Sequence, residues 1–254
     1  MPERHIVALG GGGFSMEPDD PLLDDFILRL TRKRQPRVCF VPTASGDSDN
    51  YVARFYRAFP ASRCEPSHLP LFHAGLPELN SFLAAQDVVY VGGGNTANML
   101  AVWRVHGMDK ALRRAWRKGV ILCGISAGAL CWFEAGVTDS FGSTFSALDN
   151  GLGFLRGGFT PHYDGEPERR PTLHRLLARG FPATLAAEDG VALHFRGTGL
   201  PKWCPRGPRL ARIGPNFAAA KSWKRRFPLV ILARRVRPKV SAFGFRVVVR
   251  GKTN

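Results

Sequence analysis

The chain has 254 residues, of which 44% are hydrophobic and 22% are charged, and this is enough for a large globular domain with a hydrophobic core. No apolar run approaches the roughly 20 residues that cross a bilayer, and the first residues lack the basic and apolar regions of a secretory signal peptide. We therefore expect a cytoplasmic protein that does not contact membranes. The five cysteines include no Cys-x-x-Cys pair, which argues against a disulfide framework or a structural zinc site.

The net charge of +16 is concentrated at one end of the chain. Residues 1–196 hold 21 Lys and Arg and all 20 Asp and Glu, whereas residues 197–254 hold 15 Lys and Arg and no acidic residue. The first part therefore has the charge balance of an ordinary globular domain. We predict that the chain divides into a domain over residues 1–196 and a basic C-terminal segment over residues 197–254.

Short apolar runs alternate with longer amphipathic ones before residue 196, which is the pattern of an α/β fold whose mostly parallel sheet is flanked by helices. The apolar runs predict strands at residues 6–9, 37–41, 88–91 and 120–123. Apolar residues at helical spacing predict helices at residues 22–30, 51–59, 79–85 and 112–118. A further helix is expected to begin at Thr96, which is a suitable N-cap residue.

A Gly-Ile-Ser-Ala-Gly motif at residues 124–128 follows one of these strands and precedes a segment of small residues. This is the G-x-S-x-G nucleophile elbow, in the strand–turn–helix context that the motif requires. The start of the helix offers backbone N–H groups and the positive end of the helix dipole to a developing oxyanion. We predict that Ser126 is a nucleophile; the alternative is a small-residue turn with an incidental serine.

A serine nucleophile needs a general base, and the base needs an acid that orients it. His162 ends an apolar run directly after Pro161, and the strand ends at one edge of a parallel sheet are where such sites gather. Asp139 is the leading candidate for the acid. The sequence leaves three further candidates for that role: Glu134, Asp164 and Asp189. Surface or packing roles are expected for the remaining histidines, which are His5, His68, His73, His106, His174 and His194.

A second glycine-rich segment, at residues 92–94, follows the strand predicted at 88–91 and precedes Asn95 and Thr96. It lacks the Lys-Ser/Thr pair of a P-loop and the spacing of a dinucleotide fingerprint. Beside the elbow, its backbone N–H groups can serve the carbonyl oxygen of a substrate, and we expect Asn95 and Thr96 to contact that substrate. The earlier glycines at residues 10–13 are interpreted as a flexible turn.

Three segments together resemble the peptidase E family of serine peptidases, which includes aspartyl dipeptidases and, more distantly, cyanophycinases. They are Val-Gly-Gly-Gly-Asn-Thr at residues 91–96, Gly-Ile-Ser-Ala-Gly-Ala at 124–129 and Pro-His-Tyr at 161–163. The resemblance extends from the first predicted strand to about Phe195. It implies that the domain over residues 1–196 is catalytic and is a three-layer sandwich related to the class I glutamine amidotransferases, with serine in place of their cysteine.

The resemblance also implies roles for individual residues. The implied triad is Ser126 as nucleophile, His162 as base and Asp139 as the third member. The implied oxyanion hole combines the N–H of Ala127 with that of Gly93 or Gly94.

Family members that act on N-terminal aspartate hold its side-chain carboxylate with an arginine downstream of the histidine. Arg169 is the nearest match and Arg170 is the second, and a guanidinium can bind a carboxylate through two parallel hydrogen bonds. The predicted activity is hydrolysis of short peptides, including dipeptides with N-terminal Asp, without a cofactor or a metal. A cyanophycinase-like hydrolase is an alternative, and a homo-oligomer is left open.

The basic segment over residues 197–254 contains clusters at 224–226 and 234–237, with aromatic residues scattered among them. One hypothesis is a nucleic-acid-binding appendage, in which Lys and Arg displace counterions and aromatic rings stack on bases. We favour the hypothesis that the segment is translated out of the ancestral reading frame, because the resemblance ends where the acidic residues stop. In either case the apolar runs at 229–232 and 247–249 are predicted to pair as strands.

Overall fold

The computed structural model describes residues 2–73, 75–198, 230–236 and 244–250. Its first sheet contains β1 (His5–Leu9), β2 (Arg37–Val41), β3 (Glu65–His68), β4 (Val88–Val91), β5 (Ile121–Ile125) and β10 (Ala192–Arg196). The strand order is β10-β1-β5-β4-β2-β3. The first five strands are parallel to one another, and β10 lies antiparallel to β1 at one edge.

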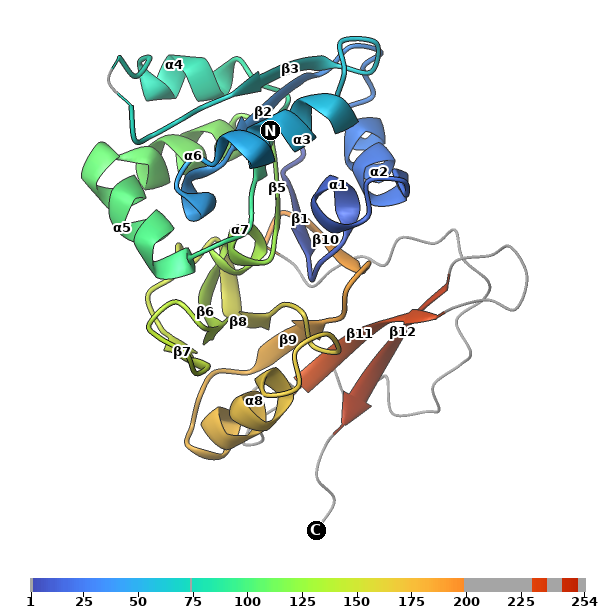
Figure 1. Ribbon diagram of the computed structural model, residues 1–254, viewed down its shortest axis with the longest axis vertical. Helices are drawn as coiled ribbons and strands as arrows, with labels where there is room; N and C mark the ends of the chain where they lie inside the picture. Colours follow the sequence, from blue (N-terminus) through green and yellow to red (C-terminus); the bar gives the residue numbers. More distant parts are fainter. Residues whose placement is uncertain (1, 74, 199–229, 237–243, 251–254) are drawn as a thin grey trace.

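Helices cover both faces of this sheet (Figure 1). One face carries α1 (Gly13–Met16), α2 (Leu22–Leu30) and α3 (Asp49–Ala58), and the other carries α4 (Leu79–Ala84), α5 (Thr96–His106) and α6 (Met108–Arg117). Side chains of β1 alternate between the two hydrophobic clusters, so Val7 lies in the cluster that contains Phe55, whereas Ile6 lies in the cluster that contains Trp103. Because both faces are covered, a central strand such as β4 is apolar along its whole length, whereas the edge strand β3 contains Glu65 and His68.

A second sheet contains β6 (Phe133–Thr138), β7 (Ser146–Leu148), β8 (Leu155–Thr160), β9 (Thr184–Ala187), β11 (Val230–Val236) and β12 (Gly244–Arg250). Its order is β12-β11-β9-β8-β6-β7, with the four inner strands parallel and both edge strands antiparallel. The short helix α7 (Ala127–Leu130) contacts β1, β4 and β5 of the first sheet and β6 and β8 of the second. The two sheets therefore meet around the segment that follows Ser126.

The predicted α/β fold with a mostly parallel sheet is confirmed, and the strands predicted at 37–41 and 88–91 match β2 and β4 residue for residue. The predicted N-cap is wrong by one position. Thr96 is the first residue of α5, and the cap is Asn95, whose side chain accepts a hydrogen bond from the N–H of Asn98 at 2.9 Å. The separate second sheet was not expected from the sequence.

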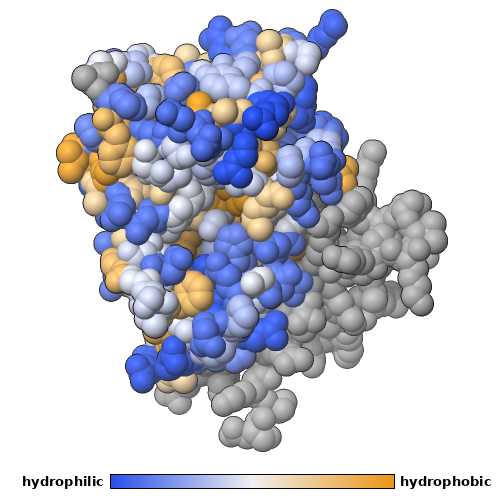
Figure 2. All heavy atoms as spheres, in the orientation of Figure 1, coloured by the Kyte–Doolittle hydropathy of each residue, from blue (hydrophilic) through white to orange (hydrophobic). Residues whose placement is uncertain are grey.

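On the face of the molecule seen in Figure 2, most of the coloured residues are hydrophilic, and the hydrophobic residues form small groups. Within the described part of the chain, no helix has the length and apolar character needed to span a membrane.

The strands predicted in the basic C-terminal segment pair as expected, since Leu232 of β11 lies opposite Val248 of β12 in an antiparallel ladder. β11 also pairs in parallel with β9. The cluster at 224–226 lies outside the described residues, as do most residues of this segment.

One carboxyl group, that of Asp24 in α2, is buried beside the aromatic side of the first sheet, with 2% of its surface exposed. Its Oδ1 and the hydroxyl of Tyr90 both point toward Gly13, where a Cβ atom would lie 3.1 Å and 3.0 Å from them. Burial raises the pKa of Asp24 from 3.8 to about 7, because an ionised carboxylate loses its hydration there.

We expect the contribution of Asp24 to the free energy of unfolding to fall as the pH rises from about 4 to about 7, since the folded chain binds more protons there than the unfolded chain. Asp24→Asn removes this ionisation, so its stability relative to the parent should be greater at pH 8 than at pH 4 by up to about 4 kcal/mol. Urea unfolding at several pH values measures the difference. Asp19→Asn, at an exposed position, is the control, and an equal response in both variants would contradict the prediction.

Candidate active site

Ser126 occupies a sharp turn between β5 and α7, with φ 55° and ψ −113°. Few non-glycine residues adopt a positive φ, and those that do cluster at functional sites. The turn is tight because Gly128 lies directly against the backbone of Val91, where a Cβ atom would clash with the Val91 carbonyl. Ser126 itself is half-buried between the buried residues Ile125 and Ala127. The strand–turn–helix geometry predicted for the elbow is therefore present.

His162 follows β8 and also has a positive φ, of 47°. Its backbone N–H donates to the carbonyl of Gly10 at 3.1 Å, and the N–H of Ser126 donates to the carbonyl of Leu9 at the same distance. Two consecutive carbonyls at the end of β1 therefore hold the backbones of Ser126 and His162 close to each other. No direct hydrogen bond joins Ser126 Oγ and the His162 ring among the described residues.

The acid beside His162 is Asp189, with 2.6 Å between His162 Nδ1 and Asp189 Oδ1. The leading candidate from the sequence, Asp139, does not make this contact. Asp139 follows β6, whereas Asp189 follows β9, and β6 and β9 are the two parallel neighbours of β8. The remaining two candidate acids bond to backbone instead: Asp164 accepts a hydrogen bond from the N–H of Asp189 at 2.9 Å, and Glu134 accepts one from a backbone N–H on β8 at 2.8 Å.

The glycines at residues 10–13, interpreted from the sequence as a flexible turn, lie against this histidine–carboxylate pair. A Cβ atom on Gly11 would clash with Asp189 Oδ1 and would lie 2.9 Å from His162 Nδ1. The close approach of the loop therefore requires a residue without a side chain at position 11. The glycine run is visible in the sequence. That it makes room for Asp189, the carboxylate that follows β9, becomes visible only in the structure.

The backbone N–H groups after β4 can be assigned one by one. Those of residues 92 and 95–98 have acceptors within the protein, and the N–H of Gly93 donates to the hydroxyl of Tyr51 at 3.2 Å. Among the described contacts, the N–H groups of Gly94 and Ala127 have no acceptor. Between the two glycines predicted for the oxyanion hole, Gly94 is therefore the one whose N–H is available.

Asn95 and Thr96, for which substrate contact was predicted, make hydrogen bonds to Ser140 within the protein. The side-chain amide of Asn95 donates to the carbonyl of Ser140 at 3.0 Å, and the N–H of Thr96 donates to Ser140 Oγ at 2.9 Å. Thr96 is buried. These bonds fix the loop that follows β6 to the start of α5.

The two candidate arginines differ sharply in their surroundings, although they are consecutive in α8 (Arg169–Ala178). Arg169 is 3% exposed, and its guanidinium bonds to the carboxylate of Glu166 and to the carbonyl of Val137. Arg170 is exposed, and its guanidinium carbon lies 4.8 Å from the ring centroid of Tyr163, the residue after His162. The guanidinium of Arg169 is therefore engaged inside the protein, whereas that of Arg170 is accessible to solvent.

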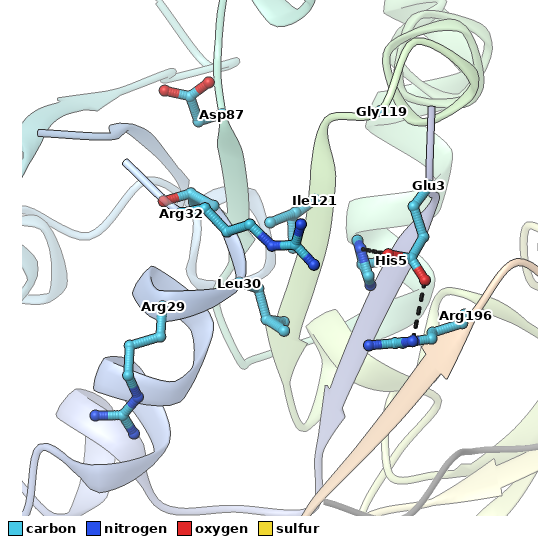
Figure 3. A pocket seen from close by; sticks show the side chains of 10 residues that line it. Glu3, His5, Arg29, Leu30, Arg32, Asp87, Gly119, Ile121 and Arg196 are labelled. Atoms are coloured by element: carbon cyan, nitrogen blue, oxygen red, sulfur yellow. Dashed lines mark ion pairs between the residues drawn. The ribbon is translucent and has the colours of Figure 1, made fainter. Parts of the chain in front are cut away.

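Two further histidines, His5 of β1 and His194 of β10, lie together near the start of β1, and His5 lines a cavity of about 280 Å³ (Figure 3). His5 Nδ1 and His194 Nε2 are 2.9 Å apart, and both rings are buried. Burial lowers the pKa of His5 and lowers that of His194 to about 4, so this pair is neutral at pH 7. Their position and packing agree with the structural role expected from the sequence.

A serine on a strained strand-to-helix turn, with a histidine–carboxylate pair whose backbone is held by the adjacent carbonyl, is typical of a hydrolase that transfers acyl groups. The chain belongs to peptidase family S51, whose family model matches residues 6–202. The protein is therefore a peptidase of that family.

Known proteins of similar sequence and fold carry related names. The chain is 56% identical over 193 residues to the uncharacterized peptidase YgaJ of Bacillus subtilis, a match that covers 76% of this chain and 83% of that protein. It is 28% identical over 187 residues to peptidase E of Streptomyces coelicolor, covering 70% and 75% of the two chains. The fold resembles the crystal structure of a peptidase from an acI-B1 Actinobacterium, with a TM-score of 0.56 and 19% identity over 77% of this chain and 85% of that one.

The position of Gly11 generates a prediction. Gly11→Ala should lower kcat/KM by roughly 100-fold, because the new methyl group must displace the carboxylate or the imidazole. Gly107→Ala is the control, since its methyl group meets nothing within 4 Å. It should cost roughly 1 kcal/mol of stability through its positive φ and leave activity unchanged. Peptide hydrolysis and thermal unfolding measure the two effects; equal activity losses in both variants would contradict the assignment.

Proposed function

We propose that this peptidase hydrolyses short peptides through a serine nucleophile, with Ser126, His162 and Asp189 as the triad. The observation that carries the proposal is the 2.6 Å contact between His162 Nδ1 and Asp189 Oδ1. The backbones of His162 and Ser126 are held by consecutive carbonyls at the end of β1. With Nδ1 engaged by the carboxylate, Nε2 is the nitrogen left to accept the proton of the serine hydroxyl.

In the proposed reaction, Ser126 Oγ attacks the carbonyl carbon of the scissile peptide bond while its proton passes to His162 Nε2. The carboxylate of Asp189 stabilises the imidazolium that forms. The histidine then gives the proton to the leaving amine as the C–N bond breaks. Water, deprotonated by the same histidine, attacks the acyl-enzyme and releases the second product and the serine hydroxyl.

The negative oxygen of the tetrahedral intermediate needs donors that are already oriented. We assign this role to the N–H groups of Gly94 and Ala127. Two facts support the assignment: neither N–H has an acceptor among the described contacts, and a Cβ atom on the adjacent Gly93 would lie 3.4 Å from Ser126 Cβ. The oxyanion hole would then combine the turn after β4 with the start of α7.

The proposed substrates are dipeptides with N-terminal aspartate, whose side-chain carboxylate would be bound by Arg170. The exposed guanidinium of Arg170 lies over the ring of Tyr163, the residue that follows the proposed base in the sequence, and it makes no ion pair with an acidic residue in the described part of the chain. A guanidinium without an acidic partner can form a paired hydrogen bond with a carboxylate.

The triad is tested by comparing two aspartates. Asp189→Asn should lower kcat by roughly 10³- to 10⁴-fold, because the histidine loses the carboxylate that orients and stabilises it. Asp139→Asn is the matched control and should retain activity, and Ser126→Ala should lose nearly all activity with its fold unchanged. Steady-state hydrolysis of dipeptides, with circular dichroism as the folding check, measures these effects. An active Ser126→Ala, or a larger loss in Asp139→Asn than in Asp189→Asn, would refute the triad.

The substrate assignment is tested separately at α8. Arg170→Ala should lower kcat/KM for Asp-Leu by roughly 10- to 100-fold, the effect of one charge-assisted contact, and should leave kcat/KM for Ala-Leu unchanged. Arg175→Ala, on the same helix with its guanidinium bonded to Thr172, is the control. If Arg170→Ala leaves the ratio of kcat/KM for Asp-Leu to kcat/KM for Ala-Leu as in the parent, the substrate carboxylate is bound by another residue.

A further inference from the structure

Tyr51 connects the core of the first sheet to the turn beside Ser126. It lies in α3 with 5% of its surface exposed, and its ring packs against Phe14 and Phe40 at centroid distances of 5.6 and 5.0 Å. A Cβ atom on Gly92 would lie 3.0 Å from its Cε1 atom. The guanidinium carbon of Arg54 is 4.8 Å from the ring centroid. The ring is therefore fixed directly beneath the turn that follows β4.

The hydroxyl of Tyr51 makes two hydrogen bonds at this position. It accepts the N–H of Gly93 at 3.2 Å and donates to Ser15 Oγ of α1 at 2.8 Å. Burial raises the pKa of Tyr51, so the hydroxyl remains protonated and can do both at neutral pH. The network thus joins α1, α3 and the turn after β4.

The peptide groups of this turn are held from both sides. Tyr51 holds the N–H of Gly93, and the N–H of Asn95 donates to the carbonyl of Ala44 at 2.7 Å. Between them lies the N–H of Gly94, which has no acceptor in the described contacts. Since glycine backbone dihedrals are the least restricted, a segment of two glycines needs such external contacts to keep one orientation.

We propose that Tyr51 is a positioning residue for the oxyanion hole, whose hydroxyl holds the N–H of Gly93 and thereby orients the N–H of Gly94 toward the substrate carbonyl. The proposal rests on the proposed function, because it assumes that Ser126 attacks a carbonyl carbon. It adds a role for a residue on α3 that makes no direct contact with the reacting atoms.

The test is Tyr51→Phe, which removes the hydroxyl and keeps the ring. If Gly94 loses its orientation, stabilisation is lost mainly in the transition state, so kcat should fall about 10-fold or more while KM changes little. A peptide boronic acid, which forms a tetrahedral adduct with an active serine, should bind more weakly by a similar factor. The affinity for a dipeptide product, which forms no such adduct, should remain as in the parent.

Tyr56→Phe is the matched control. Tyr56 lies on the same helix, and its hydroxyl makes a comparable hydrogen bond to His68 Nδ1 at 2.8 Å, without contact to the glycine turn. This variant should retain the kcat and boronate affinity of the parent. Equal kinetics in the two variants, or a raised KM with unchanged kcat in Tyr51→Phe, would overturn the proposal.

Ser15→Ala provides a second measurement that does not depend on how well Tyr51→Phe folds. It removes the acceptor of the Tyr51 hydroxyl and should lower kcat in the same way by a smaller factor; an unchanged kcat would overturn the proposal.

The Ser126→Ala variant separates the proposed function from the proposed role of Tyr51. If Ser126→Ala is active, the proposed function fails; if it is inactive while Tyr51→Phe matches its control, only the role of Tyr51 fails.

Discussion

Two consecutive carbonyl groups at the end of β1 hold the candidate active site together. They accept the backbone N–H groups of Ser126 and His162, each at 3.1 Å. Ser126 follows a strand of the first sheet, whereas His162 follows a strand of the second. Ser126 is placed by the register of β5 against β1, in which Leu9 lies opposite Ile125, and His162 is placed by the next carbonyl along the chain, that of Gly10. A change in the direction of the chain after Leu9 would move the nucleophile and the base relative to each other.

The same region concentrates unfavourable backbone conformations. Ser126 and His162 both have positive φ values, each of which costs about 1–2 kcal/mol in a residue with a side chain. Such conformations persist only where the surrounding structure determines them. Here the tight packing of Gly128 on β4 and of Gly11 on the histidine–carboxylate pair supplies that constraint. The glycines of the site thus allow close backbone contacts that compensate for the strain.

Strands such as β2 and β4 could be predicted because helices cover both faces of the first sheet, so these strands are runs of mainly apolar residues. The strand–turn–helix at Ser126 could be predicted because it depends on a local pattern, and the role of His162 as base stays a prediction. The carboxylate could not be predicted, since β8 has two parallel neighbours, and Asp139 follows one of them while Asp189 follows the other. Choosing between them requires the strand order and the direction of each loop, which are long-range properties of the fold.

The two arginines show that spacing along the sequence does not predict which side chain is buried and which is exposed. Consecutive residues on a helix point about 100° apart, so Arg169 and Arg170 face different environments although both follow His162 at nearly the same distance. The guanidinium of Arg169 is buried, and its donors are used by Glu166 and by the Val137 carbonyl. Withdrawing it to bind a substrate would leave the Val137 carbonyl without this partner, in a buried position where an unmade hydrogen bond is costly. Under the proposed function, recognition of a charged substrate would therefore fall to the exposed Arg170, whose guanidinium can exchange water for a carboxylate without disturbing the core.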